Sequence, residues 1–96
     1  MTITRINVNI INEGALVAVC SFVIGNFLKV KNVRIIRRVD GHLIVAMPSV
    51  KNSVDEFMDV VFPIDKGSRH ELERAILPRV KQQLQEHERT RPQQGH

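Results

Sequence analysis

The chain of 96 residues contains one cysteine, no tryptophan and no tyrosine. A single thiol, Cys20, excludes a disulfide within the chain and a zinc site built from several cysteines, so packing must stabilise the fold. We expect Cys20 to be a small core residue. The aromatic side chains are four phenylalanines at positions where core residues are expected, namely Phe22, Phe27, Phe57 and Phe62. A binding surface of stacked aromatic rings is therefore not predicted.

A long hydrophobic run is also missing. The longest stretch without charge covers residues 14–28, which is shorter than the ~20 residues of a membrane-spanning helix, and polar residues interrupt it. No basic cluster precedes this stretch, and residues 17–20 (VAVC) carry a bulky valine where lipoprotein processing requires a small residue. We therefore expect a cytoplasmic protein with no membrane partner.

The size and composition predict one globular domain. A chain of 11.0 kDa buries only roughly 60–65% of its unfolded surface, which excludes a large enzyme with separate cofactor and substrate domains. The hydrophobic content of 43% and charged content of 25% are typical of globular proteins. The net charge of +4 permits an acidic partner, such as nucleic acid or an anionic membrane, without specifying one.

Two β-strands are predicted at the start of the chain. Apolar and polar residues alternate along residues 2–11, a pattern typical of a strand with one buried face. Residues 15–24 are apolar on both faces, which indicates a central strand, and the turn residues 12–14 between the two predict a hairpin. Along residues 27–39 the apolar positions change phase, so we expect a bulge near Lys31-Asn32.

A second hairpin follows. Asp40-Gly41 is a strong signal for a type I′ turn, and it leads into a strand over residues 43–47 that Pro48 ends. Residues 49–56 are expected to form a polar loop, and residues 57–64 a last short strand. The predicted sheet thus has about five strands in two hairpins.

From Lys66 onward the apolar period becomes helical. Apolar residues recur every four positions and predict a buried stripe of Leu72, Ile76, Val80 and Leu84. Ser68 and Glu71 have the spacing of a capping box at the helix start. Pro78 removes a backbone hydrogen bond inside the pattern, so we expect either one kinked helix or two short helices. Residues 89–96 are polar and are expected to form a flexible tail.

Several sequence pieces together resemble the SpoVG family. They are V-R-I-I at 33–36, L-I-V-A-M-P-S at 43–49, E-F-M-D-V at 56–60 and F-P-I at 62–64, at spacings close to those of the family. Its members are small bacterial proteins named for stage V of sporulation, and they carry a septation label. The resemblance implies a SpoVG-like domain over residues 1–88, with an α+β fold in which C-terminal helices follow a curved antiparallel sheet. It also implies a homodimer that binds DNA or RNA and regulates gene expression.

The chain departs from the family pattern near the implied binding site. After Met-Pro-Ser the family has two adjacent basic residues, whereas this chain has Val50 and Lys51, so one remains. The family's glycine before the Glu-Phe pair is Asp55 here. New basic residues, Arg37 and Arg38, stand before the second hairpin turn. The site is therefore expected to combine Lys51 with these residues.

Basic residues are densest between positions 29 and 38, with no acidic residue from position 14 to 39. Such a strip can neutralise phosphates and give salt-dependent binding; alternatively, it only protects an exposed sheet edge from pairing. Arg69 matches the family's arginine at the helix start, beside N–H groups that favour anions, whereas glutamates dilute the other basic residues of the helix. The candidate nucleic-acid-binding residues are Lys29, Lys31, Arg34, Arg37, Arg38, Lys51, Lys66, Arg69 and Arg74.

Acidic residues concentrate at Asp55, Glu56 and Asp59, with Asp65 beyond them. Such carboxylates can hold Mg²⁺ for phosphodiester cleavage if they share a face. Strand alternation would place Asp55 and Asp59 on one side and Glu56 on the other, so a solvated strand edge is the preferred interpretation. The four histidines have no metal-ligand spacing, and no phosphate loop or nucleophile motif is present. No catalytic residue, metal, cofactor or small-molecule substrate is therefore predicted.

Three functions are compatible with these patterns. The preferred one is a homodimeric nucleic-acid-binding regulator without catalysis, which the family resemblance and the basic strip support. The second is a protein-interaction module of cell division or envelope control that does not bind nucleic acid. The third is a metal-dependent nuclease that uses Asp55 and Asp59.

Overall fold

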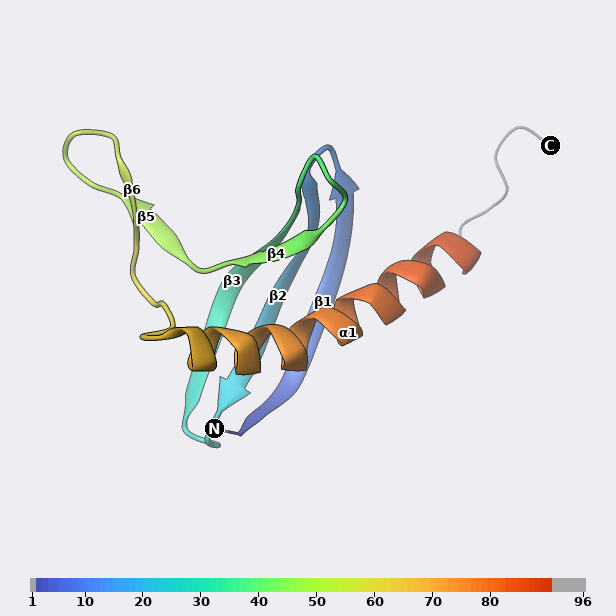
Figure 1. Cartoon of the computed structure of the whole chain (residues 1–96), viewed down its shortest axis with the longest axis horizontal. Helices are drawn as coiled ribbons and strands as arrows, with labels where there is room; N and C mark the ends of the chain where they lie inside the picture. The colour runs from blue at the N-terminus through green and yellow to red at the C-terminus, as the bar shows by residue number, and fades with distance from the viewer. Residues whose placement is uncertain (1, 91–96) are drawn as a thin grey trace.

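A computed structural model describes residues 2–90 of the chain. Four antiparallel strands form one sheet in the order β1-β2-β3-β4, two short strands form a second sheet, and a single helix follows. Their bounds are β1 (Ile3–Glu13), β2 (Leu16–Ile24), β3 (Leu28–Arg37), β4 (Leu43–Ala46), β5 (Ser49–Lys51), β6 (Phe57–Asp59) and α1 (Lys66–Thr90) (Figure 1). The predicted α+β class, with an antiparallel sheet followed by a C-terminal helix, is confirmed.

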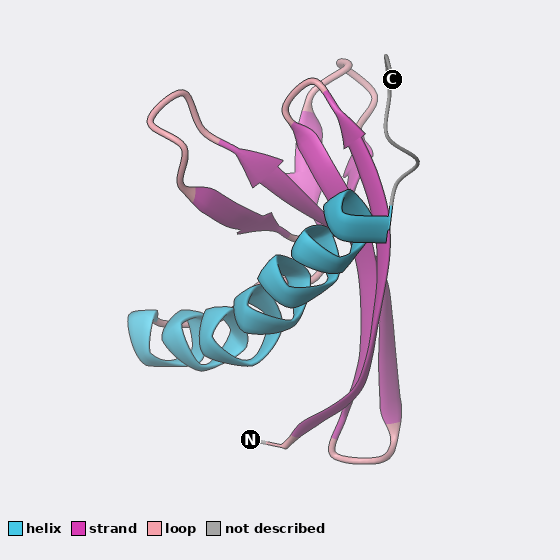
Figure 2. Cartoon of the chain, turned by 90° about the vertical axis from the view of Figure 1, so that its right-hand side faces the viewer, coloured by secondary structure: helices cyan, strands magenta, loops and turns pink. Residues whose placement is uncertain are grey.

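The four-stranded sheet curves around one side of α1 (Figure 2). β2 and β3 occupy its centre, as the two-faced apolar pattern of residues 15–24 predicts for β2. The predicted bulge in β3 is confirmed, because Cys20 pairs with Val33 and Phe22 with Val30, so that Lys31-Asn32 lies opposite one residue of β2. Asn32 adopts a φ of 62° to make this bulge. Bulges add local twist and bending, and β1 has two further register shifts, so the sheet is bent along several strands.

The hairpin between β3 and β4 forms as expected, but its turn type is different. The backbone N–H of Arg38 donates to the carbonyl oxygen of His42 at 2.8 Å, and that of Gly41 donates to the carbonyl oxygen of Arg38 at 2.9 Å. The loop therefore has three residues, 39–41. Gly41 alone in this loop has a positive φ, 91°, whereas a type I′ turn needs positive φ at both central positions. The type I′ prediction for Asp40-Gly41 is wrong.

The region after Pro48 also differs from the prediction. Residues 49–51 form strand β5 where a polar loop was expected, and the strand expected over residues 57–64 is limited to β6, which ends at Asp59. The side-chain oxygen of Asn52 accepts the backbone N–H groups of Val54 at 2.9 Å and Glu56 at 3.0 Å, and so closes a tight turn between β5 and β6. We call residues 48–60 the arm, because this hairpin extends away from the main sheet (Figure 1).

The core lies between α1 and the four-stranded sheet. Leu72, Ile76 and Val80 of the predicted helical stripe are buried, and Leu84 packs at its edge. The other buried residues are Val17, Ala18, Cys20, Phe22, Val30, Val33, Ile35 and Val45 of the sheet and Met47, which follows β4. Cys20 is a core residue, as predicted, and burial raises the pKa of its thiol to about 11.

Of the four phenylalanines, only Phe22 lies in the core. The exposed fraction is 81% for Phe27, 67% for Phe57 and 60% for Phe62. The expectation that all four are core residues is therefore wrong. The physical reason is their position: Phe27 lies in the turn between β2 and β3, Phe57 in the arm, and Phe62 in the segment between the arm and α1. All three lie outside the core cluster.

The helix α1 runs without interruption through Pro78, so the predicted break into two helices does not occur. Pro78 and Arg74, whose carbonyl loses its hydrogen bond, are both exposed, so water can solvate that carbonyl. Ile76 and Val80 on either side of Pro78 are fully buried and hold the helix on the sheet. Within residues 2–90 no helix is long and apolar enough to cross a membrane. Two residues of the predicted tail, Arg89 and Thr90, belong to α1, and the rest of that tail lies outside the described residues.

The helix start is capped by Asp65 and not by the predicted Ser68–Glu71 box. The carboxylate oxygen Oδ1 of Asp65 accepts the backbone N–H of Ser68 at 2.7 Å, and α1 begins one residue after Asp65. Asp65 is therefore the N-cap residue, and Ser68 lies in the first turn. This hydrogen bond stabilises the carboxylate and lowers the pKa of Asp65 below 3.8.

Substitution of the cap gives a prediction about stability and pH. Asp65→Ala should lower the thermal midpoint by a few degrees, because the N–H of Ser68 loses its acceptor. The folded protein lowers the pKa of Asp65, so the stability from its ionised form is present above pH 3.8 and is lost as the pH falls through the folded-state pKa. Asp65→Asn is the matched control, since asparagine also caps helices but does not titrate.

Thermal unfolding followed by circular dichroism between pH 2.5 and 7 would test this prediction. The alanine variant should be less stable than the asparagine variant at neutral pH, and the difference between wild type and the asparagine variant should shrink on acidification. Equal midpoints of the alanine variant and wild type at pH 7 would contradict the assigned cap.

Candidate nucleic-acid interface

The predicted basic strip is divided between two places by strand alternation. Val30, Val33 and Ile35 of β3 face α1 and are buried, so Arg34 lies on the opposite face of the sheet, which we call the outer face. Lys29 and Lys31 also lie there, because Lys29 precedes buried Val30 and Lys31 lies in the bulge, beside outer-face residues of β1 and β2. The structure thus brings three of the five strip residues together on one surface.

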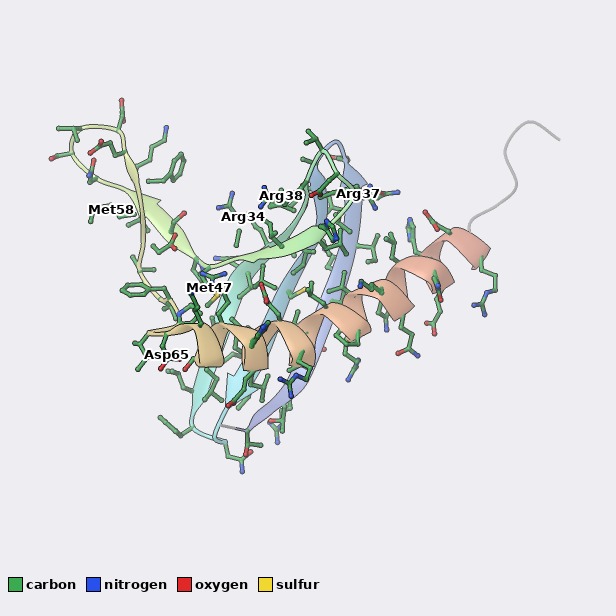
Figure 3. The ribbon with its side chains drawn as sticks, viewed as in Figure 1. Arg34, Arg37, Arg38, Met47, Met58 and Asp65 are labelled. Atoms are coloured by element: carbon green, nitrogen blue, oxygen red, sulfur yellow. The ribbon has the colours of Figure 1, made fainter. Side chains whose placement is uncertain are left out.

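The remaining two strip residues lie at the end of the β3–β4 hairpin. Arg37 pairs with Leu43 and is partly buried, whereas Arg38 lies at the start of the three-residue turn and is exposed. In Figure 3, Arg34 lies between the arm, marked by Met58, and the hairpin end, marked by Arg37 and Arg38. Arg37 and Arg38 therefore continue β3 beyond Arg34, toward its hairpin end.

The outer face and the arm enclose a groove of about 450 Å³. Strands β2 and β3 supply Val19, Asn32 and Arg34 to its lining. The arm supplies the other lining residues, Pro48, Ser49, Val50, Phe57 and Val60. One arginine and two further polar side chains thus stand beside an apolar wall that includes an aromatic ring. Such a surface can bind an anionic group and an apolar or aromatic group at the same time.

Lys51, the remaining member of the family's basic pair, lies in the same arm. Lys51 and Phe57 are direct partners in the β5–β6 ladder, and the Nζ atom of Lys51 stands 5.4 Å from the centre of the Phe57 ring. This is a cation–π contact, which orients the lysine beside the ring. The role of Phe57 was missed in the sequence, although the turn-forming Asn52 between two short alternating segments is a signal that could have indicated the hairpin.

The helix candidates lie elsewhere. Lys66, Arg69 and Arg74 are exposed on α1, and no residue of α1 lines the groove. At this helix start Asp65 accepts the N–H of Ser68 through its carboxylate and that of Arg69 through its backbone oxygen, the latter at 3.1 Å, so neither of these two N–H groups is available to an anion. An anion at this helix end would meet the charge of Asp65.

The acidic residues of the arm do not form a shared cage. Asp55 lies in the turn with a φ of 63°, outside strand β6, so the alternation expected to place it beside Asp59 does not apply. Asp59 pairs with Ser49 in the ladder. Among residues 2–90, no group of three or more histidine, cysteine, aspartate or glutamate side chains is arranged to hold a metal ion.

Comparison with known proteins covers the part of the chain that builds this groove. A family model described as SpoVG matches residues 1–82. A protein of Caldanaerobacter subterraneus named "Putative septation protein SpoVG" is 38% identical over 78 residues, which cover 80% of this chain and 85% of that protein. Proteins with the same name from Thermoanaerobacter sp. strain X514 and Clostridium perfringens are 38% and 36% identical, again over 80% of this chain, and over 84% and 86% of their own lengths.

Proposed function

The chain belongs to the SpoVG family, and on this premise we propose that it is a nucleic-acid-binding regulatory protein that acts as a homodimer and without catalysis. Its binding would be led by phosphate contacts to DNA or RNA. Through the family it would serve the control of gene expression in processes such as sporulation and septation. It would need no cofactor, no small-molecule substrate and no membrane, and it would act in the cytoplasm.

The observation that carries this proposal is the set of basic side chains in and around the groove. Arg34 lines the groove, Lys29 and Lys31 lie on the same outer face, and Lys51 stands on the adjoining arm. Within the described residues no carboxylate forms an ion pair with Arg34, so its charge is available to an external anion. Several cations along one surface can contact successive phosphates, and counterion release then favours binding.

The test is a titration with labelled DNA and RNA oligonucleotides of mixed sequence at low and high salt. We expect binding at low salt that weakens steeply as salt rises, since each phosphate contact contributes about −0.9 to the slope of log K against log salt concentration. Lys81→Gln is a suitable control because Lys81 lies on α1, away from the groove, and this variant should bind like wild type. Absence of binding even at low salt would refute the proposal.

The homodimer is supported by an exposed apolar segment between the arm and α1. Val61, Phe62 and Ile64 are exposed, and residues 60–64 carry no charge, so the segment itself places no charged side chain between two copies that meet there. These side chains border a hollow of about 270 Å³ whose floor includes the core residues Phe22 and Leu72. Burial of such an apolar surface favours association.

Sedimentation equilibrium tests this part of the proposal. The wild type should have twice the mass of the 11.0 kDa chain, and Phe62→Asp should yield a monomer, because association would bury a charge without a partner. Phe27→Asp is the control, since Phe27 is also an exposed phenylalanine but lies in the turn between β2 and β3. A monomeric wild type would refute the dimer.

A protein-interaction module is the second candidate. The name of the relatives refers to septation, and the arm exposes apolar side chains such as Val54 and Met58, which suit a protein partner. A pull-down from nuclease-treated bacterial lysate would favour this candidate if wild type retains a protein that Met58→Asp does not. It would replace the first proposal only if the oligonucleotide titration gives no binding.

A further inference from the structure

The groove has a larger apolar lining than phosphate binding requires. Phosphate oxygens are satisfied by cations and N–H donors, yet most of the groove's lining is apolar: Val19, Pro48, Val50, Phe57 and Val60. Its volume of about 450 Å³ is within the range of roughly 300–1,000 Å³ that is usual for ligand pockets. An apolar wall beside a single arginine suits a flat aromatic group attached to an anion.

Phe57 is the side chain that can receive such a group. The exposed fraction of Phe57 is 67%, which is high for a large apolar side chain held in a regular hairpin. Its place is set by ladder pairing with Lys51 and by the Asn52 turn, so the ring is presented on an ordered element. Lys51 stands over the ring at 5.4 Å and supplies a positive charge next to it. An exposed ring beside basic residues is the arrangement by which proteins bind single-stranded nucleic acid.

A double helix does not offer the matching group. In a duplex the faces of the bases are stacked on their neighbours, and only base edges and backbone are accessible. In a single strand the bases can turn out and stack on an aromatic side chain. Asn32 and Ser49 line the same groove, and their side chains can form hydrogen bonds to a base edge, because both carry donor and acceptor groups.

We propose that the groove binds an unstacked base of a single-stranded nucleic acid, which stacks on Phe57 while Arg34 and Lys51 contact the flanking phosphates. This inference rests on the proposed nucleic-acid binding and names its preferred form. It replaces the expectation that aromatic stacking has no part in recognition, which depended on a core position for Phe57.

The experiment compares three labelled probes of about 15 nucleotides by fluorescence anisotropy. They are single-stranded oligothymidylate, an abasic strand with the same number of phosphates, and a mixed-sequence duplex. Wild type should bind oligothymidylate roughly tenfold or more tightly than the abasic strand, because only the former has bases to stack. Phe57→Ala should reduce the ratio of the two affinities to about one, while its salt slope stays at the wild-type value because no cation is removed.

Phe57→Trp and Arg34→Gln separate stacking from charge. The tryptophan variant keeps an aromatic surface and should preserve the preference for oligothymidylate. For the Arg34→Gln variant, the slope of log K against log salt concentration should decrease by about one on all probes, because one phosphate contact is lost. The variant should retain the preference for bases. Far-ultraviolet circular dichroism would verify that each variant is folded, which is expected because both side chains are exposed.

The outcomes distinguish a failure of base stacking from a failure of the proposed nucleic-acid binding. If wild type binds the abasic strand or the duplex as tightly as oligothymidylate, or if Phe57→Ala keeps the preference for bases, the stacking role is refuted while nucleic-acid binding stands. If wild type binds none of the three probes at low salt, both proposals are refuted.

Discussion

Replacing Phe22 with alanine is expected to remove a large part of the protein's stability. Phe22 is fully buried, lies on the central strand β2 and belongs to the same core cluster as Met47 and Leu72. Truncation of a buried phenylalanine to alanine costs about 3–5 kcal/mol, since the lost apolar contacts leave a cavity. The whole stability of a domain this small is of the order of 5–10 kcal/mol, so much of it would be lost.

Urea unfolding followed by circular dichroism measures this effect, and Phe27→Ala provides a control of the same chemistry. Phe27 is 81% exposed, so its truncation should change the free energy of unfolding by less than about 1 kcal/mol. The pair distinguishes a core phenylalanine from one on the surface, which the composition alone cannot do. Similar losses in both variants would contradict the core described above.

The second large effect concerns the location of the nucleic-acid site. Arg34→Gln combined with Lys51→Gln should weaken binding by roughly 50-fold at 0.1 M salt and reduce the salt slope by about two, because two phosphate contacts are lost. Both residues stand at the groove or on the arm beside it. Arg37→Gln combined with Arg38→Gln removes the same charge at the hairpin end, and binding should weaken less than about threefold.

A titration of the two double variants against one oligonucleotide therefore compares two positions at equal net charge. Equal losses would mean that the overall positive field, and not the groove, attracts the nucleic acid. A larger loss in the Arg37 and Arg38 variant would move the site to the end of the β3–β4 hairpin. The sequence grouped Arg37 and Arg38 with Lys51, whereas in the structure Lys51 stands beside Phe57, which lines the groove together with Arg34.

Much of the fold could be predicted because strands and helices leave periodic patterns over a few residues. The change of phase in residues 27–39 predicted the bulge at Lys31-Asn32, and the four-residue period predicted Leu72, Ile76 and Val80 as the buried face of α1. Errors arose where two local signals compete. At the helix start, Ser68 and Asp65 are both good cap residues, and the hydrogen bond shows that Asp65 is the cap. At Pro78, the proline disfavours a helix, but burial of its neighbours Ile76 and Val80 stabilises the helix more than the proline destabilises it.

The candidate site was predicted only in part, for a different reason. Lys29, Lys31, Arg34 and Lys51 were identified by their charge and by family resemblance, but charge along a strand does not reveal which face a side chain occupies after a bulge. Phe57 was assigned to the core because large apolar side chains are usually buried. Phe57 lies instead on the arm, whose two strands pair only with each other. The sequence of the arm does not indicate whether α1 packs against it.

The amino-acid sequence by itself determined the α+β class, the central position of β2, the buried face of α1 and the excess of positive charge before Met47. These properties depend on alternation, period and composition, which are local or additive along the chain. Only the tertiary structure decided that Arg34 and Phe57 line one groove and that Arg37 and Arg38 stand apart from it. Such a site depends on the direction in which the chain leaves β4, and that direction is set by contacts between residues distant in sequence.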